Sequence, residues 1–133
     1  GKIMTINELS IIAHKNARDK GFWQAFGDIK DIALTNYENK TLDDLMIGHR
    51  LMLIVSELGE ALEALRHNKT SQGLDLDTVD FKKQVKDTFE DEIADVFIRL
   101  GDLVGYLNID IEKHIKMKMQ YNMTRPKLHG KEF

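Results

Sequence analysis

The chain has 133 residues, of which 42% are hydrophobic and 31% charged, and its net charge is −3. This length supports one domain with a core of its own. The small negative charge gives no general attraction to nucleic acid or to an anionic membrane, and the absence of cysteine excludes disulfides and thiolate metal sites. No apolar run is long enough to span a membrane and no signal peptide is visible, so we expect a single cytoplasmic domain over residues 1–133.

Helices are expected throughout, because the only proline is Pro126. Apolar residues recur at helical intervals, hydroxyl or acidic residues precede them as N-caps, and glycine or asparagine follows them. No strand-like alternation and no repeat is evident. The predicted elements are a helix from Thr5 to Gly21, a mixed loop over 22–40 with a short helix near 28–34, a long helix over about 42–66 capped by Thr41, a loop over 67–78, a second long helix over about 81–107 ended by Asn108, and a last helix from Asp110 to about Met123.

These elements predict an all-α fold, a four-helix-type bundle in which the two long helices pair antiparallel. So small a bundle cannot cover all of its apolar faces. Leu53 and Val55, for example, lie off the main apolar stripe of the helix over 42–66 and indicate a second buried face. A partner subunit is the simplest cover, so we expect a homodimer or a homotetramer.

Two acidic pairs are the most informative residues. Glu57 and Glu60 lie on the first long helix, and Glu92 and Asp95 lie on the second, each pair with i, i+3 spacing. Such a pair occupies one helix face, about 60° apart. Both pairs flank an apolar stripe on the same side, so antiparallel packing of the stripes would bring the four carboxylates to one edge of the seam.

Four carboxylates in one place need a cation or raised pKa values. Two of them about 5 Å apart repel by about 3 kcal/mol at an effective dielectric near 20. Ligands that are all oxygens, without cysteine or histidine, favour Mg²⁺ or Mn²⁺ over Zn²⁺. The sequence therefore predicts a magnesium site, with manganese as a substitute, on Glu57, Glu60, Glu92 and Asp95.

Two other interpretations compete with this one. A single acidic pair on a helix is usually a solvated face, and Arg99, on the same stripe as Glu92 and Asp95, could neutralise them as a plain salt bridge. A di-iron centre would need Glu-x-x-His on two helices, and no histidine stands three residues after a glutamate in this sequence.

The acidic pairs also carry a family resemblance. Residues 56–64, Ser-Glu-Leu-Gly-Glu-Ala-Leu-Glu-Ala, followed by 92–96, Glu-Ile-Ala-Asp-Val, resemble the E-x-x-E … E-x-x-D signature of the MazG-like all-α nucleoside triphosphate pyrophosphohydrolases. Residues 118–126 resemble the K-x-x-x-N-x-x-R segment of the dCTP pyrophosphatase branch, so the likeness runs from about residue 42 to 125. The long segment over 68–80 and the N-terminal segment depart from the pattern and leave base preference open.

This resemblance implies Mg²⁺-dependent hydrolysis of (d)NTP to (d)NMP and pyrophosphate, with the metal on the four acids and assembly as dimers or tetramers. A housecleaning role toward surplus or non-standard dNTPs would follow. Glu57 or Glu60 is the candidate to orient or deprotonate the attacking water.

Three groups of residues are candidates for substrate binding. Lys118, Asn122 and Arg125 share a face of the last helix and could grip phosphates, although cations near a helix C-terminus are also favourable without a ligand. Trp23 could stack on a base or simply close a core. His49, two turns before Glu57, could contact substrate or be a surface histidine.

The alternative to an enzyme is a non-enzymatic helical interaction or oligomerisation module. In that case the acids would be scattered, exposed, or paired with Arg99 and lysines. Burial of all four around one place favours the enzyme.

Overall fold

The structure, a computed structural model, describes residues 4–32 and 34–127. That part of the chain contains helices and no strand, which confirms the all-α prediction for it. None of its helices is both long enough and apolar enough to cross a membrane. The elements are α1 (Ile6–Asp19), α2 (Gln24–Lys30), α3 (Asn36–Arg66), the π-helical turn η1 (Phe81–Val85), α4 (Phe89–Tyr106) and α5 (Ile111–Thr124).

The long helix α3 begins earlier than expected. Thr35, not Thr41, is its N-cap, and Thr35 forms a reciprocal capping box with Glu38. Thr41 lies inside the helix, where its hydroxyl donates to the Tyr37 carbonyl oxygen. The predicted cap was therefore wrong, because Thr35 has a glutamate three residues later to complete the box and Thr41 has none.

The second long helix is shorter than expected. Residues 81–85 form the separate turn η1, and α4 begins only at Phe89, after the cap Thr88. Asp87 has φ of 66°, a left-handed conformation that a right-handed helix cannot contain. The predicted short helix near 28–34 also lies earlier, as α2, whereas the caps predicted at Thr5 and Asp110 are confirmed.

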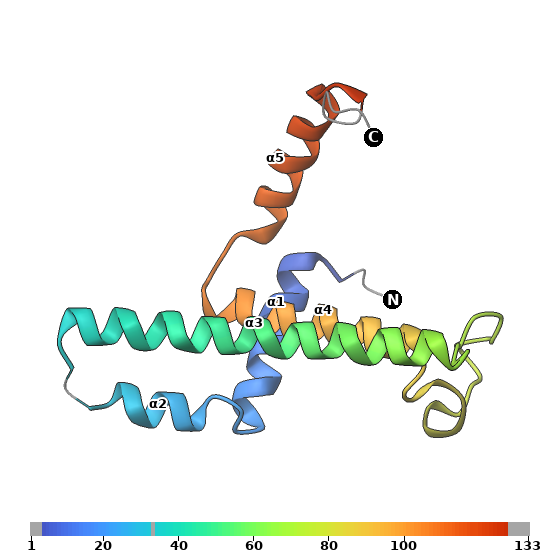
Figure 1. Cartoon of the computed structure of the whole chain (residues 1–133), viewed down its shortest axis with the longest axis horizontal. Coiled ribbons are helices and arrows are strands. Elements are labelled where there is room, and N and C mark those ends of the chain that lie inside the picture. The colour runs from blue at the N-terminus through green and yellow to red at the C-terminus, as the bar shows by residue number, and fades with distance from the viewer. Residues whose placement is uncertain (1–3, 33, 128–133) are drawn as a thin grey trace.

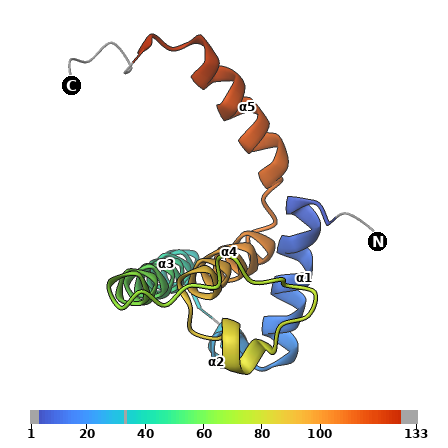
Figure 2. The ribbon, with the colours of Figure 1, turned by 90° about the vertical axis from the view of Figure 1, so that its right-hand side faces the viewer.

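Helix α4 lies between α1 and α3 (Figure 2). Its contact with α1 depends on two glycines. A Cβ atom at Gly105 would stand 2.4 Å from the Ser10 carbonyl oxygen and 2.8 Å from the His14 Cβ, and one at Gly101 would already touch Ala13. The two backbones thus cross too closely for any side chain at Gly105.

A small aromatic core lies beside this crossing. Trp23, Met46 and Leu103 are buried, and Tyr106 stacks on the Trp23 ring at 4.2 Å between ring centres. Asp102 ties the elements together, since its Oδ1 accepts from Trp23 Nε1 and pairs with His14 Nδ1, both at 2.9 Å. The core therefore joins α1, α3, α4 and the segment that leads into α2.

Much apolar surface remains exposed outside this core. Helix α5 leaves the body of the molecule (Figure 1), and its first turn is held by Asn7, whose backbone N–H donates to Glu112 at 2.8 Å.

Helix α3 carries an exposed row of apolar residues. They follow one another at alternating spacings of four and three residues, and each is 45–56% exposed. This row, the α3 seam, consists of Leu51, Val55, Leu58, Leu62 and Leu65.

The glycine crossing predicts the effect of a single methyl group. Gly105→Ala should lower the free energy of unfolding by about 1–3 kcal/mol, because the Cβ meets backbone rather than a flexible side chain. Gly48→Ala, in α3 with nothing within 4 Å of the new Cβ, is the matched control and should raise stability by up to about 1 kcal/mol. Urea unfolding of both variants measures this, and equal effects would contradict the close crossing.

Candidate metal centre

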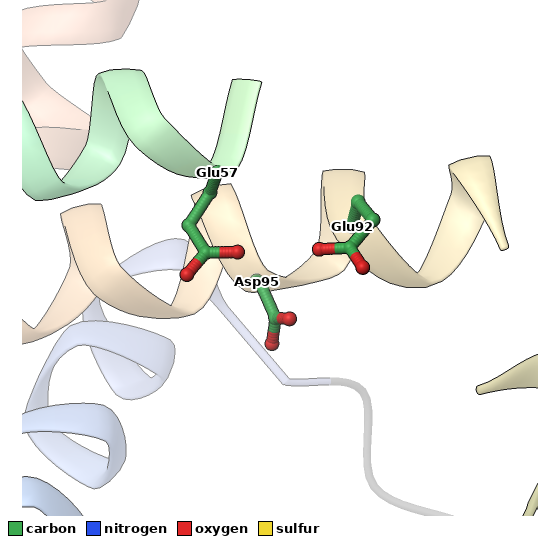
Figure 3. Close-up of side chains that lie close together, drawn as sticks. All are labelled: Glu57, Glu92 and Asp95. Carbon is green, nitrogen blue, oxygen red and sulfur yellow. The ribbon is translucent and has the colours of Figure 1, made fainter. Parts of the chain in front are cut away.

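The predicted acids come together where α3 and α4 lie side by side. Figure 3 shows the carboxyl groups of Glu57, from α3, and of Glu92 and Asp95, from α4, around a common space. Each offers an oxygen, and the three oxygens all lie within 4.8 Å of one another. Glu57 and Glu92 are only 8% and 6% exposed, and Asp95 is half-buried. We call these three residues the acid cluster.

The fourth predicted acid, Glu60, stands at the edge of the acid cluster. It is exposed, one turn along α3 from Glu57, and lines a cavity of about 490 Å³ together with Glu92. It is near enough to raise the pKa of Glu92. The i, i+3 pairs thus place two buried acids, one half-buried acid and one exposed acid around a single position.

The electrostatics of the acid cluster disfavour its full ionisation. Burial, with the neighbouring carboxylates of Glu60, Glu57 and Asp95, raises the pKa of Glu92 to about 7. Burial and then Glu57 also raise the pKa of Asp95. A nearby cation would act in the opposite direction and favour the charged form of these carboxyl groups.

One oxygen of the acid cluster is left without a partner in the described part of the chain. Glu92 Oε2 is buried and has no hydrogen-bond partner among residues 4–32 and 34–127. A buried polar atom left unpaired costs about 1–3 kcal/mol, so such atoms are rare without a reason. The donor set of carboxylate oxygens and this unpaired atom fit a hard divalent cation such as Mg²⁺ or Mn²⁺.

Arg99 is the one basic side chain in the described ranges that is hydrogen-bonded to any of the four acids. Its Nε donates to Glu57 Oε1 at 2.9 Å. The expected ion pair therefore forms, but with Glu57 on α3 rather than with Glu92 and Asp95 on its own helix. This pair does not neutralise the whole acid cluster, since the pKa values of Glu92 and Asp95 stay raised beside it.

A second cavity, of about 540 Å³, reaches the acid cluster from the side of α1. Asp95, Arg99 and Asp102 line it at successive turns of α4, and Arg50 lines it from α3. The rest of its wall is mainly apolar, from residues such as Leu9, Ile12, Phe22, Leu53 and Ile98. We call this space the α1 cavity.

The sequence analysis does not single out Asp102. This residue is 9% exposed and binds both His14 and Trp23 at one wall of the α1 cavity. The available signal was its spacing, since Asp95, Arg99 and Asp102 follow at i, i+4 and i+7 on one helix face. Its partners could not be inferred, because they are 88 and 79 residues distant in the chain.

The structure does not bring the predicted substrate-binding residues to the acid cluster. Trp23 is buried, with Tyr106 stacked on its ring and the Arg50 guanidinium 4.1 Å from the ring centre, so both faces are covered. His49 is exposed on α3. Helix α5, with its predicted phosphate-binding face, stands apart from the α3–α4 pair in both views (Figures 1 and 2). That face consists of Lys118, Asn122 and Arg125. All of these roles stay predictions.

A second acidic group has a simpler explanation. Oxygens of Asp87, Asp91 and Glu92 also lie within 4.8 Å of one another. However, the Asp91 carboxylate accepts from the Asp87 backbone N–H, and Asp87 pairs with the exposed Lys86. These bonds account for both aspartates as parts of the turn that leads into α4.

Comparisons with protein-family models, with curated proteins and with solved structures find no match for this chain. The resemblance to MazG-like enzymes therefore rests on the residues quoted above.

The raised pKa of Glu92 predicts how the metal-free protein responds to pH. Between pH 4.5, its ordinary pKa, and about 7, the folded state holds a proton that the unfolded state has released. The free energy of unfolding should therefore fall as the pH rises through this window and stay level above it. Denaturant unfolding in chelator at several pH values measures the effect.

Glu92→Gln is the control for this pH dependence, because it cannot ionise. The difference in stability between Glu92→Gln and the wild type should grow from pH 5 to pH 7 in favour of the variant. A difference that is constant with pH would show that Glu92 titrates normally.

Proposed function

We propose that this chain is a Mg²⁺-dependent nucleoside triphosphate pyrophosphohydrolase, which converts (d)NTP to (d)NMP and pyrophosphate. The observation that supports this most is the acid cluster with its buried, unpaired Glu92 oxygen. Glu57, Glu92 and Asp95, with Glu60 at the edge, would hold the metal. Bound there, Mg²⁺ would polarise phosphoryl oxygens and offset the charge of the departing pyrophosphate.

Of the two candidates to activate water, the geometry favours Glu60. Glu57 is buried and its Oε1 already accepts from Arg99. Glu60 is exposed and lines the open cavity beside Glu92, where water can reach it. A general base has to lie within hydrogen-bond reach of the water whose proton it takes, so we assign this role to Glu60.

The α1 cavity is the place we propose for the nucleoside. It has an apolar wall with a few polar groups, and its volume of about 540 Å³ lies within the range of small-molecule sites. It also ends at Asp95 and Arg99, beside the acid cluster. A nucleoside seated in it would direct its phosphates toward the metal position.

We further propose that the two long helices pair antiparallel and that two copies associate through the α3 seam. The alternating spacing of four and three residues in the seam is that of a helix packed against another in a left-handed coiled coil. On α4, Phe97 and Leu100 are also exposed. A second copy would cover this surface, as expected for a homodimer or for half of a homotetramer.

The non-enzymatic interaction module remains the second candidate. The exposed α3 seam supports such a module as much as it supports an oligomeric enzyme. The burial of Glu57 and Glu92 favours the enzyme, whereas the exposure of Glu60 departs from the expected burial of all four acids. Surface acids of an interaction module would be solvated, since burying a carboxylate without a compensating charge costs stability.

The acids should be essential for activity but not for folding. Glu57→Gln, Glu60→Gln, Glu92→Gln and Asp95→Asn should each lower the rate of pyrophosphate release from a panel of dNTPs by at least about tenfold, or 1.4 kcal/mol in barrier. The control is Asp44→Asn, which removes an exposed carboxylate elsewhere on α3 and should leave the rate unchanged.

Melting curves with and without Mg²⁺ complete this test. Divalent metal should stabilise the wild type, because it binds the folded acid cluster and not the unfolded chain. An inactive wild type with no shift at any Mg²⁺ concentration would support the interaction module instead.

The phosphate-binding face of α5 can be tested in mixed oligomers. Since α5 stands apart from the acid cluster of its own chain, we expect Arg125 to serve the cluster of another copy. Arg125→Ala and Glu57→Gln should each be impaired alone, and mixing them by co-expression should restore about a quarter of the wild-type sites in a dimer. No recovery in mixed oligomers would remove α5 from the partner's site.

A further inference from the structure

We propose that Arg99 is a phosphate-binding residue, which holds Glu57 with one nitrogen and meets the ligand's phosphate oxygens with the others. This inference rests on the proposed function, in that the ligand is a nucleoside triphosphate. It assigns Arg99 a direct contact with substrate, where the sequence offered only a neutralising salt bridge.

The first support is the way the guanidinium is bonded. Arginine has five N–H donors in a planar fork, and here only Nε donates, to Glu57 Oε1. The terminal nitrogens Nη1 and Nη2 have no hydrogen-bond partner in the ranges that the structure describes, and the side chain is 44% exposed. The bond through Nε therefore fixes the fork while leaving its outer edge open.

The second support is the position of Arg99 on α4. It lies one turn from Asp95 and lines the α1 cavity together with it. A ligand that extends from this cavity to the acid cluster would lie beside both side chains. Its phosphates would then lie next to the open edge of the fork.

The third support is charge. A triphosphate approaching four carboxylates is repelled by each of them, and a divalent cation offsets only part of this. The other arginine of the α1 cavity, Arg50, is held by the Phe22 carbonyl oxygen at 2.7 Å and lies on the Trp23 ring. Of the cations that line this cavity, which also include Lys20, Arg99 is the one hydrogen-bonded to the acid cluster in the described ranges.

These contacts also explain why the residue is an arginine. A lysine ammonium could pair with Glu57 or with a phosphate as a point charge, but it has no fork to bind both along fixed directions. If Arg99 were only a surface ion pair, lysine would serve as well.

The test compares Arg99→Gln and Arg99→Lys with the wild type and with Arg66→Gln. Arg66 forms an exposed ion pair with Glu63, so its variant loses the same charge away from the acid cluster. Three quantities are measured: Mn²⁺ affinity of the protein alone by electron paramagnetic resonance, and, by calorimetry with Mg²⁺, the affinities for an α,β-imido dNTP analogue and for inorganic pyrophosphate.

We expect Arg99→Gln to weaken binding of both the analogue and pyrophosphate by at least about tenfold, while Mn²⁺ affinity changes by less than about threefold. Arg99→Lys should recover only part of this, and Arg66→Gln should match the wild type. Melting curves confirm that each variant is folded.

Several results would overturn the assignment. Unchanged affinity for the analogue and pyrophosphate with reduced Mn²⁺ affinity would mean that Arg99 only orients Glu57. Equal losses in Arg66→Gln would mean that bulk charge is responsible, and full recovery in Arg99→Lys would rule out the fork. If the wild type binds pyrophosphate through Arg99 but no nucleotide analogue, the proposed function fails while the phosphate contact stands; if it binds neither, both fail.

Discussion

The crossing of α1 over α4 is the constraint on which the rest of the structure depends. It exists because α4 presents no side chain at Gly105, where the Ser10 backbone passes. The close approach lets His14 reach Asp102, and the same carboxylate then receives the indole N–H of Trp23. The aromatic core and one wall of the α1 cavity follow from this one contact.

On its opposite side α4 makes a contact of a different kind. There the α3–α4 interface includes carboxylates that repel one another, and Glu92 keeps a buried oxygen without a partner in the described part of the chain. Such an arrangement is unfavourable in the metal-free fold, because carboxyl groups are buried close together there. One helix thus combines a tightly packed face with an electrostatically strained one.

The sequence predicted those features that depend on spacing within a single helix. The i, i+3 acids and the caps at Thr5 and Asp110 are local patterns, and the helices have them where expected. The start of α3 was mistaken because Thr35 and Thr41 are both possible caps, and only the reciprocal bond with Glu38 decides between them. Contacts between segments that are far apart in the chain could not be predicted from such local patterns.

Asp102 and α5 show that limit most clearly. Nothing in the residues around Asp102 indicates that an indole and an imidazole will both reach it from another helix and its following turn. For α5, helical periodicity gives the length and the faces but not the direction in which the helix leaves the body. That direction is set by tertiary contacts at its first turn.

The attachment of α5 at Asn7 has a mechanical consequence. Asn7 bonds to both Asp110 and Glu112, so it is a pivot at one end of a helix of 14 residues. A rise of 1.5 Å per residue makes this lever about 20 Å long, and a rotation of about 10° at the pivot moves its far end by about 3.5 Å. A small change in the contacts of Asn7 would therefore be magnified at the far end of α5.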